Sequence, residues 1–346
     1  MGVLDRFFKR GRCSVGIDIG SRSVKVAVVE KEGGAFGMRD AFIFPLPSGT
    51  IEEGRVVDED ALVDVLKAVK KAVSRGDFVA VLPSTASLVA TFELPEDTAE
   101  EQIDYLVVEE IAKKIPVSIS EVSFDYCVVE LDGKRYVNAV IGKKKVIRRF
   151  LSIYEKAGIS LDSITSVYTA LSNAFLVNYP DEGEKCAYLV DVGHSVSTFC
   201  FLKGGLMIHG RSSSLGTEKV EEYVASALNI DASRVREIMG AGEIDERVLN
   251  EAVESFAGLL AEELEACSVF CEHHASFEKS GSISVYISGE ATELPRFVPL
   301  LSASLSENFK AFQLDPFRKV AIPDDLAAYI ADVKGSFAVA VGAGVS

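Results

Sequence analysis

Apolar and polar residues alternate along this chain with two different periods, which predict short strands and longer helices. Runs of β-branched residues predict strands, whereas apolar residues spaced three and four apart predict helices. Strands are expected at Ser14 to Ile19, Val24 to Val29, 77–83, 87–95, 122–131, 134–143 and 282–289, with a strand-turn-strand at 185–205. Helices are expected at Asp58 to Ser74, 96–116, 146–158, 166–179, most of 217–279, part of 290–308 and 335–346. This order of elements predicts an α/β fold.

The helix expected at 96–116 has a recognisable start and stop. Thr98 is followed three residues later by Glu101, which is the capping-box spacing, and Pro116 ends the apolar pattern. Its apolar residues recur on one face, as in a helix that packs on a sheet. With the strands on either side, this helix predicts a small α/β insert of roughly 80 residues, within the range of a small folding unit.

Composition and charge narrow the class of protein. The 346 residues are 48% hydrophobic, enough for two domains or one bilobed domain. The net charge of -16 opposes binding to nucleic acid. Since no run approaches the ~20 apolar residues of a membrane span, and the N-terminus lacks the apolar core of a secretory signal, we expect a cytoplasmic protein without a transmembrane segment. Its six cysteines are expected to remain reduced.

Two stretches repeat one pattern, in which an Asp inside an apolar strand precedes a Gly, a polar turn and a second strand. A phosphate chain with bound Mg²⁺ needs backbone N–H groups, small residues that allow close approach, and carboxylates. One such turn is most often an ordinary Asp-Gly hairpin, but two matched copies roughly 170 residues apart predict a two-sided site. The first copy contributes Asp18, Gly20, Ser21, Ser23 and Lys25, and the second contributes Asp191, Gly193, Ser195 and Thr198.

These motifs resemble those of the actin-like ATPase superfamily and, within it, the PilM family of type IV pilus assembly proteins. Residues 16–30 and 189–199 are similar to the two phosphate motifs of the family, 285–297 to its adenosine motif and 336–345 to its second connecting helix. The insert carries the dipeptides Leu94-Pro95, Ile115-Pro116 and Asp125-Tyr126, which are also similar to the family pattern.

The resemblance implies an actin-like (ribonuclease H-like) two-lobed fold with an IC subdomain insert of the kind found in FtsA and PilM. Because the chain ends at Ser346 without the C-terminal amphipathic helix of FtsA, PilM is favoured. We expect subdomain IA at 12–83, 164–185 and 332–346, IC at 84–163, IIA at 186–230 and 280–331, and IIB with the helix returning to IIA at 231–279.

The resemblance also implies ATP and Mg²⁺ as cofactors and a membrane protein as partner. Asp18 and Asp191 would orient the metal, and Lys25 would neutralise phosphate charge. Backbone N–H groups for phosphate would come from Gly20, Ser21, Gly193 and Ser195, with Gly289 and Glu290 beside the nucleotide. The implied partner is the N-terminal cytoplasmic tail of a PilN-like inner-membrane protein, bound in a groove between IA and IC, together with other components of the pilus platform.

Three departures from the family pattern concern ATP hydrolysis. Ser166 stands where a Glu or Gln is expected to orient the attacking water, so hydrolysis is expected to be weak or absent. Glu290 follows Gly289 where a second glycine is usual, and its side chain would crowd the nucleotide or repel its phosphates. His194, at the tip of the second turn, is either a cation that contacts phosphate or an exposed turn residue.

Other interpretations stay open from the sequence. Cys267, Cys271 and His274 have the helical spacing of zinc ligands, but the apolar face of a long helix explains them better. An FtsA-like filament-forming division protein, a phosphotransferase such as a sugar kinase, and a nucleotide-free degenerate adaptor are the alternative functions.

Overall fold

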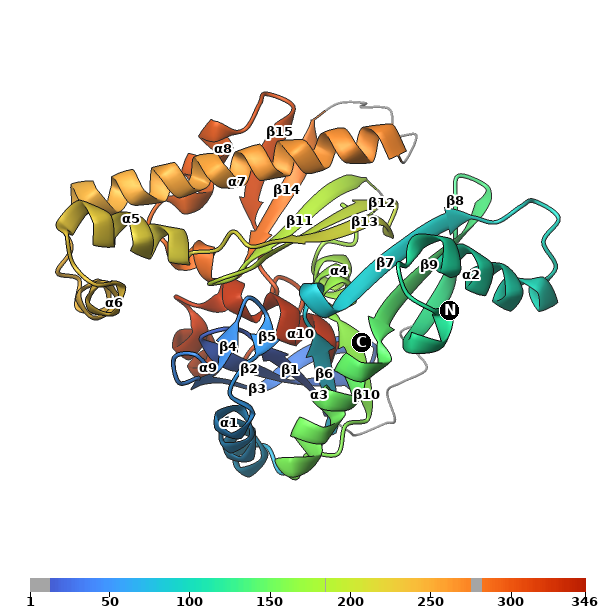
Figure 1. Ribbon diagram of the computed structural model, residues 1–346, viewed down its shortest axis with the longest axis horizontal. Coiled ribbons are helices and arrows are strands. Elements are labelled where there is room, and N and C mark those ends of the chain that lie inside the picture. The colour runs from blue at the N-terminus through green and yellow to red at the C-terminus, as the bar shows by residue number, and fades with distance from the viewer. Residues whose placement is uncertain (1–12, 184, 275–281) are drawn as a thin grey trace.

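The structure is a computed structural model that describes residues 13–183, 185–274 and 282–346. Two five-stranded sheets form its two lobes, and a three-stranded sheet projects from the side (Figure 1). The strand orders are β10-β6-β1-β2-β3 in the first sheet, β13-β12-β11-β14-β15 in the second and β7-β9-β8 in the third.

The first sheet holds both parallel and antiparallel neighbours. Its strands are β1 (Ser14–Ile19), β2 (Ser23–Glu32), β3 (Ala35–Pro45), β6 (Asp77–Leu82) and β10 (Ser163–Ser166), and a short pair, β4 (Ile51–Glu52) and β5 (Arg55–Val56), lies beside it. One face packs on α1 (Glu59–Ala72) and α3 (Lys144–Lys156). The other packs on α4 (Val167–Asn178), α9 (Asp324–Ile330) and α10 (Ala338–Gly344).

The small residues of α10 let this helix pack closely against its neighbours. A Cβ added at Gly342 would lie 1.7 Å from the carbonyl oxygen of Ala170 in α4, and one added at Gly16 of β1 would lie 2.0 Å from the Ala340 oxygen. Only glycine fits where backbones approach so closely. The prediction of a closely packed small-residue helix at the end of the chain is therefore confirmed.

The second sheet shares the helix α4 with the first. Its strands are β11 (Cys186–Val192), β12 (Ser197–Lys203), β13 (Leu206–Ser213), β14 (Ile283–Ser288) and β15 (Phe309–Gln313). One face packs on α4, and the other on α5 (Glu218–Leu228), α7 (Glu246–His274) and α8 (Phe297–Ser304), while α6 (Ala232–Gly240) follows α5. Because α4 contacts both sheets, it lies in the layer that joins the lobes.

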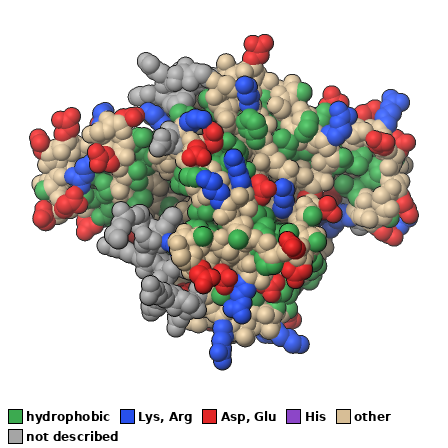
Figure 2. All heavy atoms as spheres, turned by 180° about the vertical axis from the view of Figure 1, so that it is seen from behind, with side chains coloured by type: hydrophobic (Ala, Val, Ile, Leu, Met, Phe, Trp, Pro, Cys, Tyr) green, Lys and Arg blue, Asp and Glu red, His purple; other side chains and the backbone are tan. Residues whose placement is uncertain are grey.

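The third sheet and α2 (Glu100–Lys114) form the projecting part of the predicted insert, whose second helix, α3, packs on the first sheet. The strands of the third sheet are β7 (Ser87–Glu93), β8 (Val122–Leu131) and β9 (Lys134–Lys143), and α2 covers one face. Asp132 and Gly133 both have positive φ at the predicted β8–β9 turn. Residues 84–143 include twelve acidic and five basic residues. Figure 2 shows the insert at the left end of the rear face, where acidic side chains outnumber basic ones.

The predicted capping box of α2 is wrong. Thr98 is not the N-cap, which is Ala99, and its Oγ1 instead donates to the carbonyl oxygen of Pro95 at 2.8 Å. The helix begins one residue after Ala99, whose N–H donates to Oε1 of Gln102 at 3.2 Å. Thr98 thus belongs to the turn that follows Leu94-Pro95, and the helix α2 begins two residues later, at Glu100.

Within the described ranges, no single helix combines the length and apolar character needed to cross a membrane. The pair Asp324–Ile330 and Lys334–Gly344, bent by 104°, meets that criterion by length and composition only when its two parts are taken together.

The predicted subdomain boundaries stay predictions.

Candidate functional site

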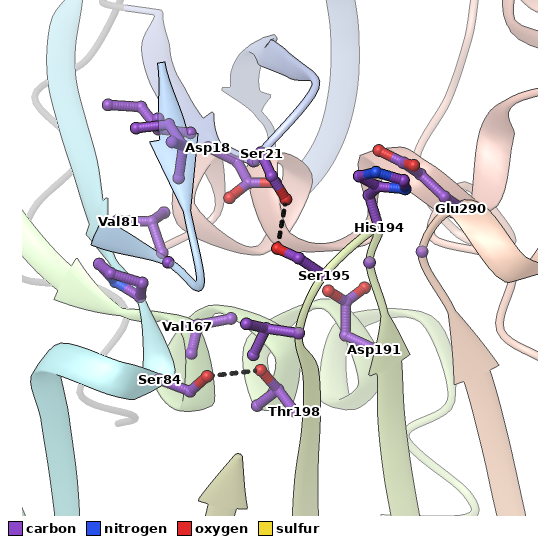
Figure 3. Close-up of a pocket in the computed structure, with 18 of the residues that line it drawn as sticks. Asp18, Ser21, Val81, Ser84, Val167, Asp191, His194, Ser195, Thr198 and Glu290 are labelled. Atoms are coloured by element: carbon purple, nitrogen blue, oxygen red, sulfur yellow. Dashed lines mark hydrogen bonds between the residues drawn. The ribbon is translucent and has the colours of Figure 1, made fainter. Parts of the chain in front are cut away.

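A cleft between the two large sheets is lined by both Asp-Gly turns (Figure 3). The cavity volume of this cleft is about 90 Å³, which is smaller than the usual range of small-molecule sites. The first turn contributes Asp18, Gly20, Ser21 and Lys25, the second contributes Asp191, Gly193, Ser195 and Thr198, and the end of β14 contributes Gly289 and Glu290. Ser23 is buried and does not line the cleft.

The two turns are built alike, which explains why the sequence pattern repeats. In the first hairpin Asp18 lies opposite Lys25, and the N–H of Gly20 donates to the Ser23 carbonyl at 3.0 Å. In the second, Asp191 lies opposite Thr198, and the N–H of Gly193 donates to the Val196 carbonyl at 3.1 Å. Each hairpin therefore places one carboxylate at the end of a buried strand and a tight glycine turn beside it.

Both aspartates point into the cleft from opposite lobes and are held in an environment that disfavours their charge (Figure 3). Burial raises the pKa of Asp18 to about 6, against the opposing effect of Lys25, and Asp191 and Glu290 add to the rise. Burial also raises the pKa of Asp191, although Oγ of Ser288 donates to its Oδ1 at 2.7 Å. Within the described part of the chain, no hydrogen bond reaches the Asp18 carboxylate, which leaves its oxygens available to a cation.

Lys25 has a partner from the opposite lobe. Its Nζ lies 3.4 Å from Oε1 of Glu290, and the two side chains are 8% and 14% exposed. Burial alone would lower the pKa of Lys25, but the carboxylates of Glu290, Asp18 and Asp191 together raise it. Lys25 is therefore a charged ammonium in an acidic cleft, and the Glu290 side chain lies beside it.

Three further contacts hold the walls of the cleft together. Oγ of Ser21 and Oγ of Ser195 are hydrogen-bonded at 2.8 Å across the two turns (Figure 3). Oγ1 of Thr198 donates to Oγ of Ser84 at 2.9 Å, and Arg22 forms an ion pair with Glu221 of α5. Because the turns touch through Ser21 and Ser195, a phosphate chain between them requires the lobes to separate.

The residues of the cleft fit ATP-Mg²⁺ in their chemistry. Carboxylate oxygens are the ligands that Mg²⁺ prefers, and Asp18 offers an unbonded carboxylate. The turns have little room for side chains, since a Cβ added at Gly193 would lie 3.0 Å from the Val196 oxygen. Lys25 supplies the positive charge that a phosphate chain needs.

The structure gives Ser166 a structural role. Its Oγ accepts the backbone N–H of Thr169 at 3.1 Å, which makes it the N-cap of α4, and its side chain is buried outside the cleft lining. Among the described residues, α4 contributes Val167 to the cleft lining and no carboxylate or amide.

His194 lines the cleft, half-buried rather than exposed. Burial, with Arg22 nearby, lowers its pKa to about 4, so the ring is neutral at physiological pH. The interpretation of His194 as an exposed turn residue is therefore wrong, whereas its contact with phosphate as a cation stays a prediction.

The cysteines of α7 belong to the core of the second lobe. Cys267 and Cys271 pack with Tyr188 and the other residues of this core. The side chain of His274 lies outside the described residues, and no cluster of three metal-ligating side chains occurs among those described.

The sequence interpretation missed the residues that follow β6. Pro83, Ser84 and Thr85 line the cleft. The sequence signal was the apolar strand that stops at Pro83. Because β1 and β6 pair in parallel, the ends of both strands reach the same edge of the sheet.

Comparisons with known proteins agree with this architecture. The family model described as type IV pilus assembly protein PilM matches residues 16–345. A solved structure, "PilM-PilN type IV pilus biogenesis complex", is similar with a TM-score of 0.77 and 19% identity, over 96% of this chain and 98% of that chain. The ethanolamine utilization protein EutJ from Carboxydothermus hydrogenoformans is similar with a TM-score of 0.54 and 14% identity, over 97% and 91%. The predicted actin-like two-lobed α/β fold is confirmed, and the chain belongs to the PilM family of type IV pilus assembly proteins.

Proposed function

We propose that this protein is a cytoplasmic scaffold of the type IV pilus inner-membrane platform that binds ATP-Mg²⁺ between its lobes. The observation that carries the proposal is the meeting of Asp18 and Asp191, from two different sheets, in one cleft. Asp18 and Asp191 hold the metal, Lys25 holds phosphate, and Gly20, Ser21, Gly193 and Ser195 offer backbone N–H groups. Bound Mg²⁺ would neutralise part of the negative charge of the two buried carboxylates and of the phosphates.

The partner in this proposal is the N-terminal tail of a PilN-like membrane protein, bound between the insert and the first lobe. The similarity to a PilM-PilN complex supports this partner. The excess of acidic residues in 84–143 favours a tail that carries positive charge. Binding of this kind attaches the scaffold to the inner membrane through its partner and requires no catalysis.

The base of the insert connects the cleft to this peptide site. The η2 turn (Ser84–Ala86) begins the insert and lines the cleft, and Ser84 bonds Thr198 of the second Asp-Gly hairpin. On its other side the insert contacts the second sheet, where Thr91 Oγ1 and Asn138 Nδ2 donate to the Met207 carbonyl at 2.5 and 2.8 Å. A ligand that changes the angle between the lobes therefore also moves the insert, which makes peptide binding sensitive to nucleotide.

Calorimetric titration of the nucleotide-stripped protein tests the proposal. We expect wild type to bind ATP-Mg²⁺, Asp18→Ala to lose that binding, and Asp64→Ala, on the exposed face of α1, to retain it. A synthetic tail peptide of a PilN-like protein should bind with an affinity that ATP-Mg²⁺ changes. If the peptide binds but ATP-Mg²⁺ does not, the protein is a nucleotide-free adaptor, the alternative that the Lys25–Glu290 pair favours.

Filament formation of the FtsA type is a separate test. Light scattering with and without ATP-Mg²⁺ distinguishes it, because a scaffold that binds a peptide tail as a monomer gives no increase in scattering.

A further inference from the structure

The buried ion pair between Lys25 and Glu290 joins the two lobes at the place where phosphate is expected. Lys25 is on β2 of the first sheet, and Glu290 opens the η4 turn (Glu290–Glu293) after β14 of the second sheet. Among the described residues, Glu290 is the only carboxylate within 4.0 Å of the Lys25 ammonium. The carboxylate of Glu290 therefore balances the positive charge of the Lys25 ammonium within the same chain.

The backbone holds Glu290 in this position. Gly289 has φ 85°, and a Cβ added to it would lie 2.4 Å from the Val192 oxygen, so only glycine fits there. Its N–H donates to the Gly335 carbonyl at 3.0 Å, and Thr292 Oγ1 donates to the Gly289 carbonyl at 2.7 Å. Glu290 thus begins at a fixed point beside the second Asp-Gly turn, and its side chain reaches across the cleft.

We propose that Glu290 is an internal anion that takes the place of a ligand phosphate at Lys25 and holds the lobes together. The inference rests on the proposed nucleotide site, and it assigns to Glu290 the control of that site. A polyphosphate then binds by displacing the Glu290 carboxylate, and the lobes open as it does so. The ion pair competes with every anionic ligand of the cleft.

The outer ion pair across the cleft differs from this one. Arg22 is 35% exposed and its partner Glu221 also lies 3.5 Å from Arg236, so the Glu221 charge stays compensated when the lobes separate. Breaking Lys25–Glu290 instead leaves the Lys25 ammonium without its ion-pair partner, with only the more distant charges of Asp18 and Asp191 to compensate it. The inner pair is therefore the one whose loss creates a demand for an external anion.

Hydrogen–deuterium exchange without any ligand tests the closing role. We expect Glu290→Gln to exchange faster than wild type in the two turns, residues 19–23 and 193–196. Glu293→Gln is the matched control, because it removes a neighbouring charge whose carboxylate accepts from Ser336 and does not contact Lys25. Equal exchange in wild type and Glu290→Gln, or the same increase in Glu293→Gln, overturns the proposal. Glu290→Gly, which restores the usual family residue, is the second variant should Glu290→Gln fold poorly.

Titration with inorganic tripolyphosphate and Mg²⁺ tests the competition. If the pair is closed in about nine molecules of ten, its removal increases affinity by about tenfold, and Glu293→Gln leaves affinity unchanged. Equal affinity of wild type and Glu290→Gln refutes the competition even when both bind, and the proposed nucleotide site then stands. Faster exchange in Glu290→Gln with no tripolyphosphate binding by any variant supports the closing role and refutes the nucleotide site.

Discussion

Removal of the Asp18 carboxylate should stabilise the ligand-free protein at neutral and basic pH. Burial is the main reason, since it raises the pKa of Asp18 from 3.8 to about 6 despite the opposing effect of Lys25. A carboxyl group with a higher pKa in the folded state binds more protons there than in the unfolded state. Folding stability therefore falls as the pH rises from about 4 through 6, and the loss is complete above the folded-state pKa.

The magnitude follows from this shift. A rise from 3.8 to about 6 corresponds to about 3 kcal/mol of lost stability at pH 8, an upper value because solvent reaches Asp18 through the mouth of the cleft. Asp18→Asn keeps the shape of the side chain and removes the charge. For a chain of 346 residues the variant should unfold about 4 °C higher than wild type at pH 8.

Thermal unfolding in metal-free buffer with a chelator, between pH 4 and 8, is the assay. The stabilisation by Asp18→Asn should become small at pH 4, where the carboxyl group is protonated in the folded state and close to half protonated in the unfolded state. Asp64→Asn is the control, because Asp64 is 76% exposed on α1 and its loss should have little effect at any pH. A variant that is no more stable than wild type at pH 8, or equally stabilised at pH 4 and 8, would refute the reasoning.

Three further predictions concern single contacts. Gly342→Ala should lower the free energy of unfolding, measured with denaturant, by about 1–3 kcal/mol or more, because the new Cβ would lie 1.7 Å from the Ala170 oxygen. Gly258→Ala in α7 is the control and should be neutral or stabilising, because a Cβ there would have no atom within 4 Å outside the backbone of its own helix. Ser166→Ala should lose about 1 kcal/mol with the N-cap of α4, with ATP-Mg²⁺ affinity unchanged; a changed affinity would contradict the purely structural role. Ser84→Ala should reduce the effect of ATP-Mg²⁺ on tail-peptide affinity, measured by calorimetry, while each ligand alone still binds; an unchanged effect would exclude Ser84 from the coupling.

Local patterns predicted the site hairpins because each is complete within about fifteen residues, the length over which strand periodicity and turn chemistry act. The same logic located α1, α4 and the β8–β9 hairpin. It failed at Thr98, which lies in the turn after Pro95 and donates its hydroxyl proton to the Pro95 carbonyl, while the N-cap of the helix is Ala99. The neighbouring turn, and not the preference of Thr98 for an N-cap, therefore sets where this helix begins.

Several elements of the sheets were not predicted. The strand β3 was missed because Arg39 and Asp40 interrupt its apolar pattern next to an irregularity in the β2–β3 register. The strands β10, β13 and β15 and the helix α9 were missed as well. Short or interrupted elements of this kind depend on pairing and burial that one sequence window does not contain.

The contacts across the cleft could not be predicted from the sequence. Glu290 lies 265 positions from Lys25, and only the assembled lobes bring them together. The sequence identified Glu290 as a departure from the family pattern, but it did not reveal that this carboxylate faces the lysine.

The charges in the cleft explain why this departure matters. Asp18, Asp191 and Glu290 place three carboxylates around one ammonium, and burial raises the pKa of Asp18. Buried charge that is not balanced within the chain is expected where a ligand supplies the balance. Glu290 compensates Lys25 but increases the excess of negative charge, so the ligand that replaces it at Lys25 must bring a cation for Asp18 and Asp191. A magnesium-bound polyphosphate meets both requirements, whereas a free polyphosphate would meet only the first.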